Sequence, residues 1–409
     1  MIQHEISRIS CSTGELRTDS HAWEQRQLGE VAEKTGSGGT PVSSNPRYYG
    51  GSIPFLGIGD INGRYVDTTQ KTLTEEGVAN SAAWIVPEGA ISLAMYASYG
   101  KSAILARPMA TSQAFFNIVF RSNVTRDFVY SRLQCAESRH EWDVLVSTGT
   151  QPNLSGSKLK KWTIGYPSLP EQRRIGEFFS TLDSLIAAAE RQEALLRQKK
   201  QAYLQLMFPQ ESETEPQLRF SGFNDAWKRI ALRSVLKINE ERNTASEFGF
   251  DKTISVSTMR FKPEGNGAAH ASLETYRVLR VGDVAFEGNR HKEYPYGHVV
   301  INDIGDGLMS SRFRSFRPTQ LICVPFWKYL LQNRYIMTPL LLRSTMRGTL
   351  MNELVVDDFL KQRTPMPSLQ EQLEIGDFFE TLDRLIENAE GRIAQLRKMK
   401  SSYLQKLFV

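Results

Sequence analysis

The 409 residues are too many for one ordinary domain, so the chain is expected to form two or three units with separate cores. Apolar residues make up 40% and charged residues 23% of the chain, which excludes disorder of the whole protein. Lysine and arginine total 50 against 45 acidic residues, and the net charge of +5 is compatible with a polyanionic partner without identifying one.

Residues 1–22 lack the apolar core that a secretory signal requires, and no run of about 18 apolar residues occurs in the chain. We therefore expect a cytoplasmic protein in which residues 1–22 form a leader. Cys11, Cys135 and Cys323 are far apart and outside any metal-ligand spacing, so neither a disulfide framework nor a zinc site is indicated.

Residues 23–164 combine helix and strand signals. The stretch 23–41 opens with a short helical period and ends in a glycine-rich turn, and glycines and prolines then divide residues 45–63 into short strands. Residues 91–105 alternate as a strand hairpin does, and residues 127–142 are helical in character. This segment predicts a mixed α and β domain and not a doubly wound sheet.

Residues 165–208 predict a long helix that occurs twice in the chain. Residues 167–208 align with residues 367–408 at a constant offset of 200, and 24 of the 42 pairs are identical. Every seventh residue is apolar, as at the a positions of a heptad. These a positions are Ile175, Leu182, Ala189, Leu196 and Tyr203, with Ile375, Leu382, Ala389, Leu396 and Tyr403 in the second copy. The first d positions are Phe178, Leu185, Phe378 and Leu385, and the later seam is partly polar.

Such a helix of about 37 residues rises about 55 Å, which is longer than a small domain can cover. The two copies are therefore expected to bury their seams against each other as an antiparallel coiled coil. Packing of each helix on its own domain is the alternative.

Residues 209–226 contain proline, serine and glutamate without a helical period, which predicts a linker. Residues 227–364 faintly repeat the first globular segment, and residues 365–409 hold the second helix. The predicted fold is α+β, with two pseudo-repeated mixed α/β domains, residues 23–164 and 227–364, separated by the two long helices.

From about Trp23 to Phe408 the chain resembles the specificity subunits of type I restriction-modification enzymes. The matching features are GSGGTP with YYGGSIPFL downstream, GTQPNLSGSKLKKW before the first helix, LRFSGFNDAW at the second domain and, most specific, the twice-occurring PSLxEQxxIGxFFxTLDxLI helix. The resemblance implies two target recognition domains, each reading one half of a split DNA site. The first module lacks the RFSGF lead-in of the second, which leaves its natural start open.

By this resemblance the chain is a non-catalytic DNA-binding subunit that directs adenine methylation and restriction in phage defence. The implied partners are double-stranded DNA, two adenine methyltransferase subunits and endonuclease/translocase subunits. No cofactor is expected on this chain, because the methyl donor, Mg and ATP belong to the partner subunits. The alternative is the DNA-specificity subunit of a related methylation-based phage-defence system. A self-sufficient DNA methyltransferase and a coiled-coil scaffold that binds no nucleic acid are the rivals from other classes.

Short matches to catalytic motifs do not support an enzyme. NPRY at residues 45–48 and FLGIG at residues 55–59 resemble methyltransferase motifs, but the few residues between them cannot hold an intervening strand and helix. YGKS at residues 99–102 has Met95 where a phosphate-binding loop requires glycine. The six histidines form no i, i+4 pair that would suit a metal.

Base reading requires polar and aromatic side chains on projecting loops, with basic groups holding phosphates. The first-module candidates for DNA binding are Arg47, Tyr48, Tyr49, Arg64, Tyr96, Ser98, Tyr99, Lys101 and Gln113. The second-module candidates are Arg260, Lys262, Asn289, Arg290, His291, Lys292, Tyr294, Tyr296, Arg312 and Arg314. For each residue the alternative is a solvated loop side chain or, for a tyrosine, a half-buried core position.

The repeated helices are expected to provide both the helix pair and a partner surface. The apolar interface candidates are Ile175, Phe178, Leu182, Leu196, Ile375, Phe378, Leu382 and Leu396. Glu171, Gln172, Asp183 and their copies are the polar candidates for binding a methyltransferase.

Overall fold

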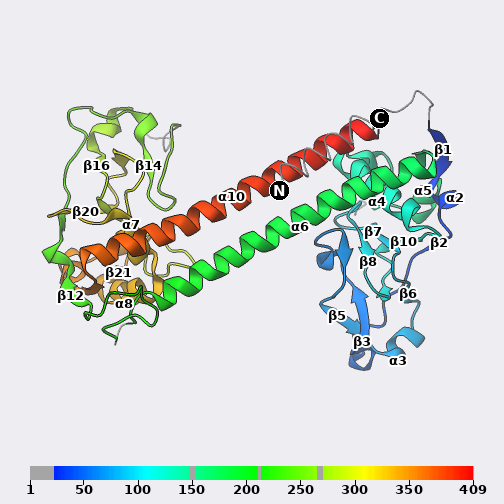
Figure 1. Ribbon diagram of the computed structural model, residues 1–409, viewed down its shortest axis with the longest axis horizontal. Coiled ribbons are helices and arrows are strands. Elements are labelled where there is room, and N and C mark those ends of the chain that lie inside the picture. The colour runs from blue at the N-terminus through cyan, green and yellow to red at the C-terminus, as the bar shows by residue number, and fades with distance from the viewer. Residues whose placement is uncertain (1–22, 147–152, 211–212, 265–269, 409) are drawn as a thin grey trace. The chain divides into compact units, whose positions relative to one another are not determined.

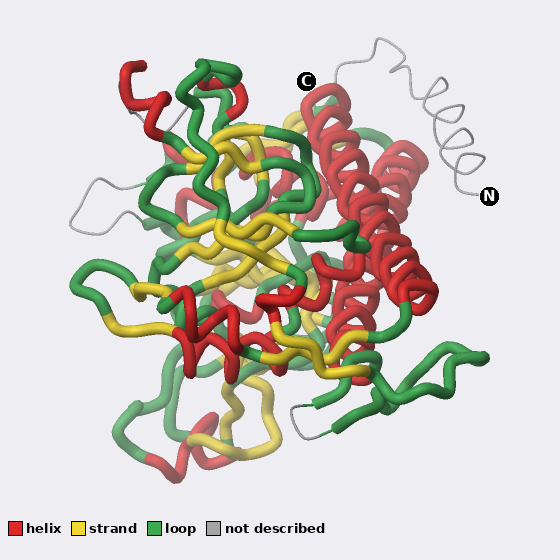
Figure 2. The backbone as a smooth tube through the Cα atoms, turned by 90° about the vertical axis from the view of Figure 1, so that its left-hand side faces the viewer, coloured by secondary structure: helices red, strands yellow, loops and turns green. Residues whose placement is uncertain are grey.

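The computed structural model describes residues 23–146, 153–210, 213–264 and 270–408, and the chain divides into two compact units (Figure 1). Unit 1 comprises residues 1–191 and 389–409, and unit 2 comprises residues 192–388. Helices, short strands and long loops alternate along the chain (Figure 2), so the predicted α+β class is confirmed. The expected leader, residues 1–22, lies outside the described residues.

Unit 1 is built on a five-stranded sheet in the order β2-β10-β7-β8-β4. Its strands are β2 (Lys34–Gly36), β10 (Phe115–Val119), β7 (Ile91–Ala94), β8 (Ser102–Leu105) and β4 (Tyr65–Val66). β7 and β8 pair antiparallel as the hairpin predicted for residues 91–105, and β10 pairs antiparallel with β7. Every residue of β7 and β8 is buried, which indicates that both faces of the sheet are covered.

A second sheet of unit 1 has the order β5-β3-β9-β6. Its strands are β5 (Lys71–Leu73), β3 (Tyr49–Leu56), β9 (Met109–Thr111) and β6 (Trp84–Val86). β3 runs antiparallel to β5 and parallel to β9, with Leu56 opposite Thr111. Because β9 leads directly into β10, this pairing joins the two sheets of unit 1.

The remaining elements of unit 1 close the globular segment. α4 (Asn123–Ser138) contains most of the predicted helical stretch and begins where the Ser122 side chain accepts a hydrogen bond from the Val124 amide. The helical period predicted after Trp23 is wrong for its first residues, because β1 (Glu24–Gln27) pairs antiparallel with β11 (Thr163–Tyr166). Only the single turn α2 (Leu28–Val31) is helical there, and α5 (Gly156–Lys161) precedes β11.

Unit 2 has a four-stranded central sheet in the order β13-β20-β17-β18, which matches the order β2-β10-β7-β8 of unit 1. Its strands are β13 (Leu236–Ile238), β20 (Arg314–Pro318), β17 (Val284–Glu287) and β18 (His298–Ile301). Four further antiparallel pairs surround it: β12 (Lys228–Ala231) with β23 (Arg363–Met366), β14 (Ile254–Ser255) with β15 (Arg260–Phe261), β16 (Arg277–Leu279) with β19 (Gly307–Met309), and β21 (Thr345–Arg347) with β22 (Asn352–Leu354). The helices are α7 (Val324–Gln332), α8 (Arg334–Ser344) and α9 (Val356–Lys361).

The two copies of the repeated segment form the long helices α6 (Leu169–Leu206) and α10 (Leu369–Leu407). In unit 1 the Phe178 and Tyr403 rings lie 5.0 Å apart, and Lys400 donates to Asp183 at 2.7 Å. The same contacts recur in unit 2, where Tyr203 lies 5.1 Å from Phe378 and Lys200 donates to Asp383 at 2.6 Å. Residue numbers rise on one helix as they fall on the other, so the paired segments in each unit are antiparallel.

The apolar seam of the helices departs from the predicted heptad after its first turns. The a residue Leu382 is buried as predicted, but the d residue Leu385 is 45% exposed, whereas the next residue, Ile386, is 5% exposed. The e residues Phe179 and Phe379, which the heptad did not select, are also buried. Both lie in the core of their unit, because each long helix packs on the globular segment as well as on the other helix.

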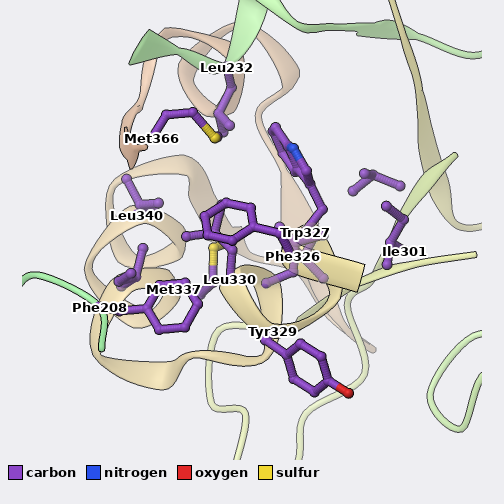
Figure 3. Close-up of a cluster of buried hydrophobic side chains, with 14 of the residues drawn as sticks. Phe208, Leu232, Ile301, Phe326, Trp327, Tyr329, Leu330, Met337, Leu340 and Met366 are labelled. Atoms are coloured by element: carbon purple, nitrogen blue, oxygen red, sulfur yellow. The ribbon is translucent and has the colours of Figure 1, made fainter. Parts of the chain in front are cut away.

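Each unit completes its apolar core with the C-terminal end of one long helix. Phe208, beyond the end of α6, packs in unit 2 with Trp227, Phe326 and Phe379. Figure 3 shows Phe208 and Phe326 in this core. Phe408, beyond the end of α10, packs in the same way in unit 1 with Trp23, Phe128 and Phe179. Each core thus contains the start of one copy of the helix and the end of the other.

A glycine in each copy permits close approach between the long helix and the globular segment. A Cβ at Gly176 would lie 3.0 Å from Cβ of Asp127, and a Cβ at Gly376 would lie 2.8 Å from Cβ of Pro325. Both contacts are tighter than ordinary van der Waals packing allows, so these two positions require glycine.

Candidate nucleic-acid interface

Two loops of unit 2 meet at one end of the central sheet. Residues 288–297 connect β17 to β18, and residues 310–313 connect β19 to β20. The register places Glu287 opposite His298 and Phe286 opposite Arg314, so both loops leave the sheet at the same end. Loops projecting from one end of a rigid sheet are well placed to contact a ligand.

Most of the second-module candidates lie on this sheet end. Asn289, Arg290, His291 and Lys292 are exposed on the 288–297 loop, and Tyr294 and Tyr296 are half-buried at its return. Arg312 is exposed in the second loop, and Arg314 is the exposed first residue of β20. Arg260 and Lys262 are exposed at and just after β15.

Hydrogen bonds connect the 288–297 loop to the β21–β22 hairpin. The Asn352 amide donates to Gly288 O and its side chain donates to Pro295 O, both at 2.8 Å, and the Arg290 guanidinium donates to Gly348 O. These bonds restrain a loop that would otherwise be free, which favours a defined recognition surface. The hairpin was not among the predicted site residues.

A cleft of about 360 Å³ opens beside the 310–313 loop in unit 2. Lys262 and Arg312 line it together with the serines Ser255, Ser257 and Ser310. Glu287, which is 8% exposed, also lines the cleft and accepts a hydrogen bond from the Asn289 side chain. Sequence reasoning missed Glu287, because a carboxylate inside a strand carries no loop signal.

The equivalent sheet end of unit 1 carries the equivalent loops. Residues 95–101 connect β7 to β8, residues 112–114 connect β9 to β10, and the Met95 amide donates to Ala114 O at 2.8 Å. The candidates on these two loops are Tyr96, Ser98 and Gln113, which are exposed, and Tyr99 and Lys101, which are half-buried.

Two of these unit 1 candidates have partners that fix them. The Tyr99 hydroxyl donates to the Asp143 carboxylate at 3.1 Å, which raises the pKa of Tyr99. The Gln113 carbonyl oxygen accepts from the Thr40 hydroxyl at 2.8 Å. The structure therefore brings five first-module candidates together on one sheet end.

Arg47, Tyr48 and Tyr49 lie elsewhere in unit 1. Arg47 and Tyr48 belong to a 3-10 turn before β3, and the Tyr49 hydroxyl donates to Pro41 O at 2.8 Å. They stand at the start of β3, and the far end of that strand pairs with β9, the strand before the Gln113 loop. The structure does not bring these three residues to the sheet end.

Arg64 also differs from the other candidates, because its side chain is only 3% exposed. Its guanidinium donates to Asp127 at 2.8 Å and to Asp183 at 3.1 Å and lies over the Tyr130 ring. A guanidinium with two carboxylate partners stabilises the contact between α4 and α6. This arrangement favours a structural role for Arg64 over contact with DNA.

Three of the six polar helix candidates, Gln172, Glu371 and Gln372, are buried within their own unit. The Glu371 carboxylate, 1% exposed, pairs with Arg219 at 2.7 Å and accepts from the Trp227 indole at 3.2 Å. Gln172 is fully buried and donates to Pro167 O at 2.8 Å. The expectation that this set forms a partner-binding surface is wrong for these two residues, because burial leaves them nothing to offer a partner.

The predicted apolar interface residues of the helices are buried or half-buried. Ile175, Phe178 and Leu182 lie in the core of unit 1, where Leu396 joins them. Ile375 and Leu382 lie in the core of unit 2, where Phe378 and Leu196 pack against them.

The sequence profile described as "Type I restriction modification DNA specificity domain" matches residues 21–198 and 224–398, one match for each module. The chain belongs to this family. Family membership assigns the protein to DNA specificity, which is a non-catalytic role in a type I restriction-modification system.

Two specificity subunits are similar to this chain over more than nine tenths of their own length. The specificity subunit of the type I restriction enzyme MjaIX from Methanocaldococcus jannaschii is 24% identical over 94% of this chain and 92% of its own. The crystal structure of the type I S subunit from M. genitalium has a TM-score of 0.60 at 14% identity, covering 96% of this chain and 98% of its own. A second chain, from a study of complex assembly of a type I system, has a TM-score of 0.54 at 16% identity, covering 95% and 97%. These two structures show the shared fold.

The structure also bears on membrane and metal sites within its described part. No helix in residues 23–146, 153–210, 213–264 or 270–408 has the length and apolar character to cross a membrane. Within the same ranges, no three His, Cys, Asp or Glu side chains gather in a way that could hold a metal ion.

Proposed function

We propose that this specificity subunit reads a two-part DNA site, one part with each unit, and so directs adenine methylation and restriction by partner subunits. The observation that supports this most is the recurrence of one loop pair. In both units the loop between the two central sheet strands lies beside the loop that enters the neighbouring strand. Two copies of one reading surface suit a site with two separate parts.

The chemistry of the loops supports DNA as the ligand. The unit 2 loops expose Arg290, Lys292 and Arg312, which can hold phosphates, beside amide and hydroxyl groups that can read base edges. Major-groove edges differ between base pairs in their donors and acceptors, so such loops can specify sequence.

The partners follow from the same proposal. Two adenine methyltransferase subunits and the endonuclease/translocase subunits carry out the chemistry, and they bind the methyl donor, Mg and ATP. This chain binds no cofactor itself. Purified without partners, it should transfer no labelled methyl group, and turnover that survives removal of contaminating subunits would contradict this.

We further infer that the paired helices set the spacing between the two parts of the site. Half-sites on one face of B-DNA are separated by about 10 to 10.5 base pairs or a multiple of that number. Inserting four residues into α6 breaks the heptad and should alter the spacing or abolish binding. The insertion is placed in the middle of α6, between the residues that pack in unit 1 and those that pack in unit 2, so both globular segments should keep their core contacts with the helix.

Exchange of residues 23–164 for those of another family member tests the central claim. Genome methylation sequencing should then show one half of the modified site changed and the other half retained. A change of both halves together would overturn the proposal and would indicate a single composite surface. A salt-dependent DNA shift assay on the intact complex separates this function from that of a scaffold that binds no nucleic acid.

A further inference from the structure

Arg277 of unit 2 is a buried cation without an acidic partner. Its residue is 5% exposed, and one terminal nitrogen donates to Asn239 O at 2.7 Å. Within the described part of the chain, its buried Nε atom has no hydrogen-bond partner. No carboxylate there forms an ion pair with Arg277, although the charge of Glu240 acts on it.

Other arginines of the same unit have ample acidic partners. Arg280 pairs with Glu241, Glu247 and Asp306, and Arg317 pairs with Glu241 and Asp283. Unit 2 therefore contains buried and half-buried carboxylates close by, but they serve Arg280 and Arg317 and leave Arg277 uncompensated.

The charges nearest to Arg277 increase its electrostatic cost. Burial, and then Arg242 and Arg314, lower the pKa of Arg277. The Arg242 backbone bridges to the Arg277 backbone, and its guanidinium donates to Thr275 O at 2.7 Å. Glu240 opposes this effect only as the smallest of the causes, so the positive charges of Arg242, Arg277 and Arg314 are not balanced. Such an excess of guanidinium charge is unfavourable unless an anion joins it.

The position of this cluster indicates which anion it meets. Arg314 is the first residue of β20, at the sheet end that carries the 288–297 loop. Arg277 lies opposite Met309, the residue before the 310–313 loop. A ligand lying on the reading loops therefore passes over the arginines, and the anion that DNA presents there is a backbone phosphate.

We propose that Arg242, Arg277 and Arg314 form a binding site for one DNA backbone phosphate in unit 2. This inference rests on the proposed DNA-reading function and adds to it a residue that positions the duplex without reading bases. In the described part of unit 1 the strand position that matches Arg277 is Trp84 in β6, not an arginine, and its ring lies 4.7 Å from the Lys34 ammonium. The two units thus hold the backbone by different means.

The test uses Arg277→Met and Arg314→Gln in the intact complex with the methyltransferase subunits. Arg233→Gln is the matched control, because Arg233 is exposed near the start of β13, which pairs with the opposite end of β20. Binding is measured by fluorescence anisotropy at several salt concentrations, on a duplex with the methylated site and on a scrambled duplex.

Each test variant should weaken binding to both duplexes by a similar factor, roughly fivefold or more, and leave the methylated sequence unchanged. The slope of log affinity against log salt should fall by about 0.9 for the lost phosphate contact. The control variant should match the wild type. Unchanged affinity and slope in Arg277→Met, with wild-type binding intact, would overturn the inference.

A second measurement separates this site from a structural arginine and from the proposed function. Inorganic phosphate should raise the thermal midpoint of the wild-type chain but not that of Arg277→Met. Without phosphate, Arg277→Met should melt no lower than the wild type, because Asn239 O still accepts from the Ser315 hydroxyl at 3.3 Å. A lower midpoint with no phosphate effect on the wild type would overturn the phosphate site. Failure of the wild-type complex to bind any DNA would instead overturn the proposed function, while the phosphate measurement would still decide the site.

Discussion

The Tyr294 ring stacks on the His298 imidazole, with centroids 4.1 Å apart and planes 20° from parallel. This contact holds the return of the 288–297 loop against the first residue of β18. Burial lowers the pKa of His298 to about 4, so the imidazole is neutral at physiological pH. Its Nε2 atom has no hydrogen-bond partner that would stabilise a charged form.

Stability should therefore fall as the pH decreases from 6.5 towards 4. Over this range the unfolded chain binds a proton at His298 that the folded chain does not, so protonation favours unfolding. Urea unfolding should show a loss of about 2 kcal/mol from this residue between pH 7 and pH 4.5. His298→Phe retains a ring for Tyr294 and should show a loss smaller by this amount. Equal losses in both proteins would contradict the assignment.

Asp183 and Asp383 occupy the same position in the two helix copies but should differ in importance. Asp183 pairs with two cations, Arg64 and Lys400, whereas Asp383 pairs with Lys200 and accepts a hydrogen bond from the Tyr329 hydroxyl. Asp183→Asn should cost about 3 kcal/mol, and Asp383→Asn about 1 to 2 kcal/mol, because the first substitution leaves more buried positive charge unpaired. Urea unfolding of both variants checks the order, and the reverse order would refute it.

Two glycines of α10 should respond to alanine with opposite signs. A Cβ at Gly376 would lie 2.8 Å from Pro325, whereas a Cβ at Gly391 would meet nothing within 4 Å. Gly376→Ala should destabilise the protein by about 1 to 3 kcal/mol through overpacking. Gly391→Ala should stabilise it by about 0.5 to 1 kcal/mol, since alanine favours the helix. Thermal unfolding measures both, and destabilisation by Gly391→Ala would show that helix propensity does not govern that position.

In the proposed two-part DNA site, Glu287 should help to specify one base pair of the part assigned to unit 2. Glu287 lines the same cleft as Lys262 and Arg312, and a carboxylate accepts a hydrogen bond from the cytosine amino group. Glutamine at this position pairs better with adenine. Genome methylation sequencing of Glu287→Gln should show one position of that half-site shift from cytosine towards adenine.

The exposed Glu293 lies on the same loop but does not line the cleft, so Glu293→Gln is the control and should leave the site unchanged. An unaltered site in folded, active Glu287→Gln would remove Glu287 from base reading.

Periodicity and repetition predicted the long helices, the hairpin of residues 91–105 and the mixed α+β domains, because these features depend on local pattern. The strand at Glu24 was missed, since its partner, β11, lies far along the chain and no local signal reports such a pairing. The shift of the buried stripe from Leu385 to Ile386 was missed because a heptad assumes one partner helix, whereas α10 also packs on its globular segment.

The candidate site was predictable where it lies on loops and unpredictable where it lies in strands. Loop composition selected Arg290 and Arg312, which the structure places at one sheet end. The same reasoning also selected Arg64, whose burial depends on two carboxylates that are distant in sequence. It passed over Arg277, because a strand arginine is conspicuous only once its lack of an acidic partner is known.

Phe208 and Phe408 each complete a core to which the other copy of the repeat contributes. A substitution at the end of one helix copy therefore alters the packing of the globular segment that holds the start of the other copy. A compensating change must arise in a different part of the gene. Recombination that homogenises the two copies restores the fit in a single event, whereas independent drift destroys it. The two parts of the chain therefore differ in how they tolerate change: the exposed loops at the sheet ends can vary singly, whereas the two helices must change together.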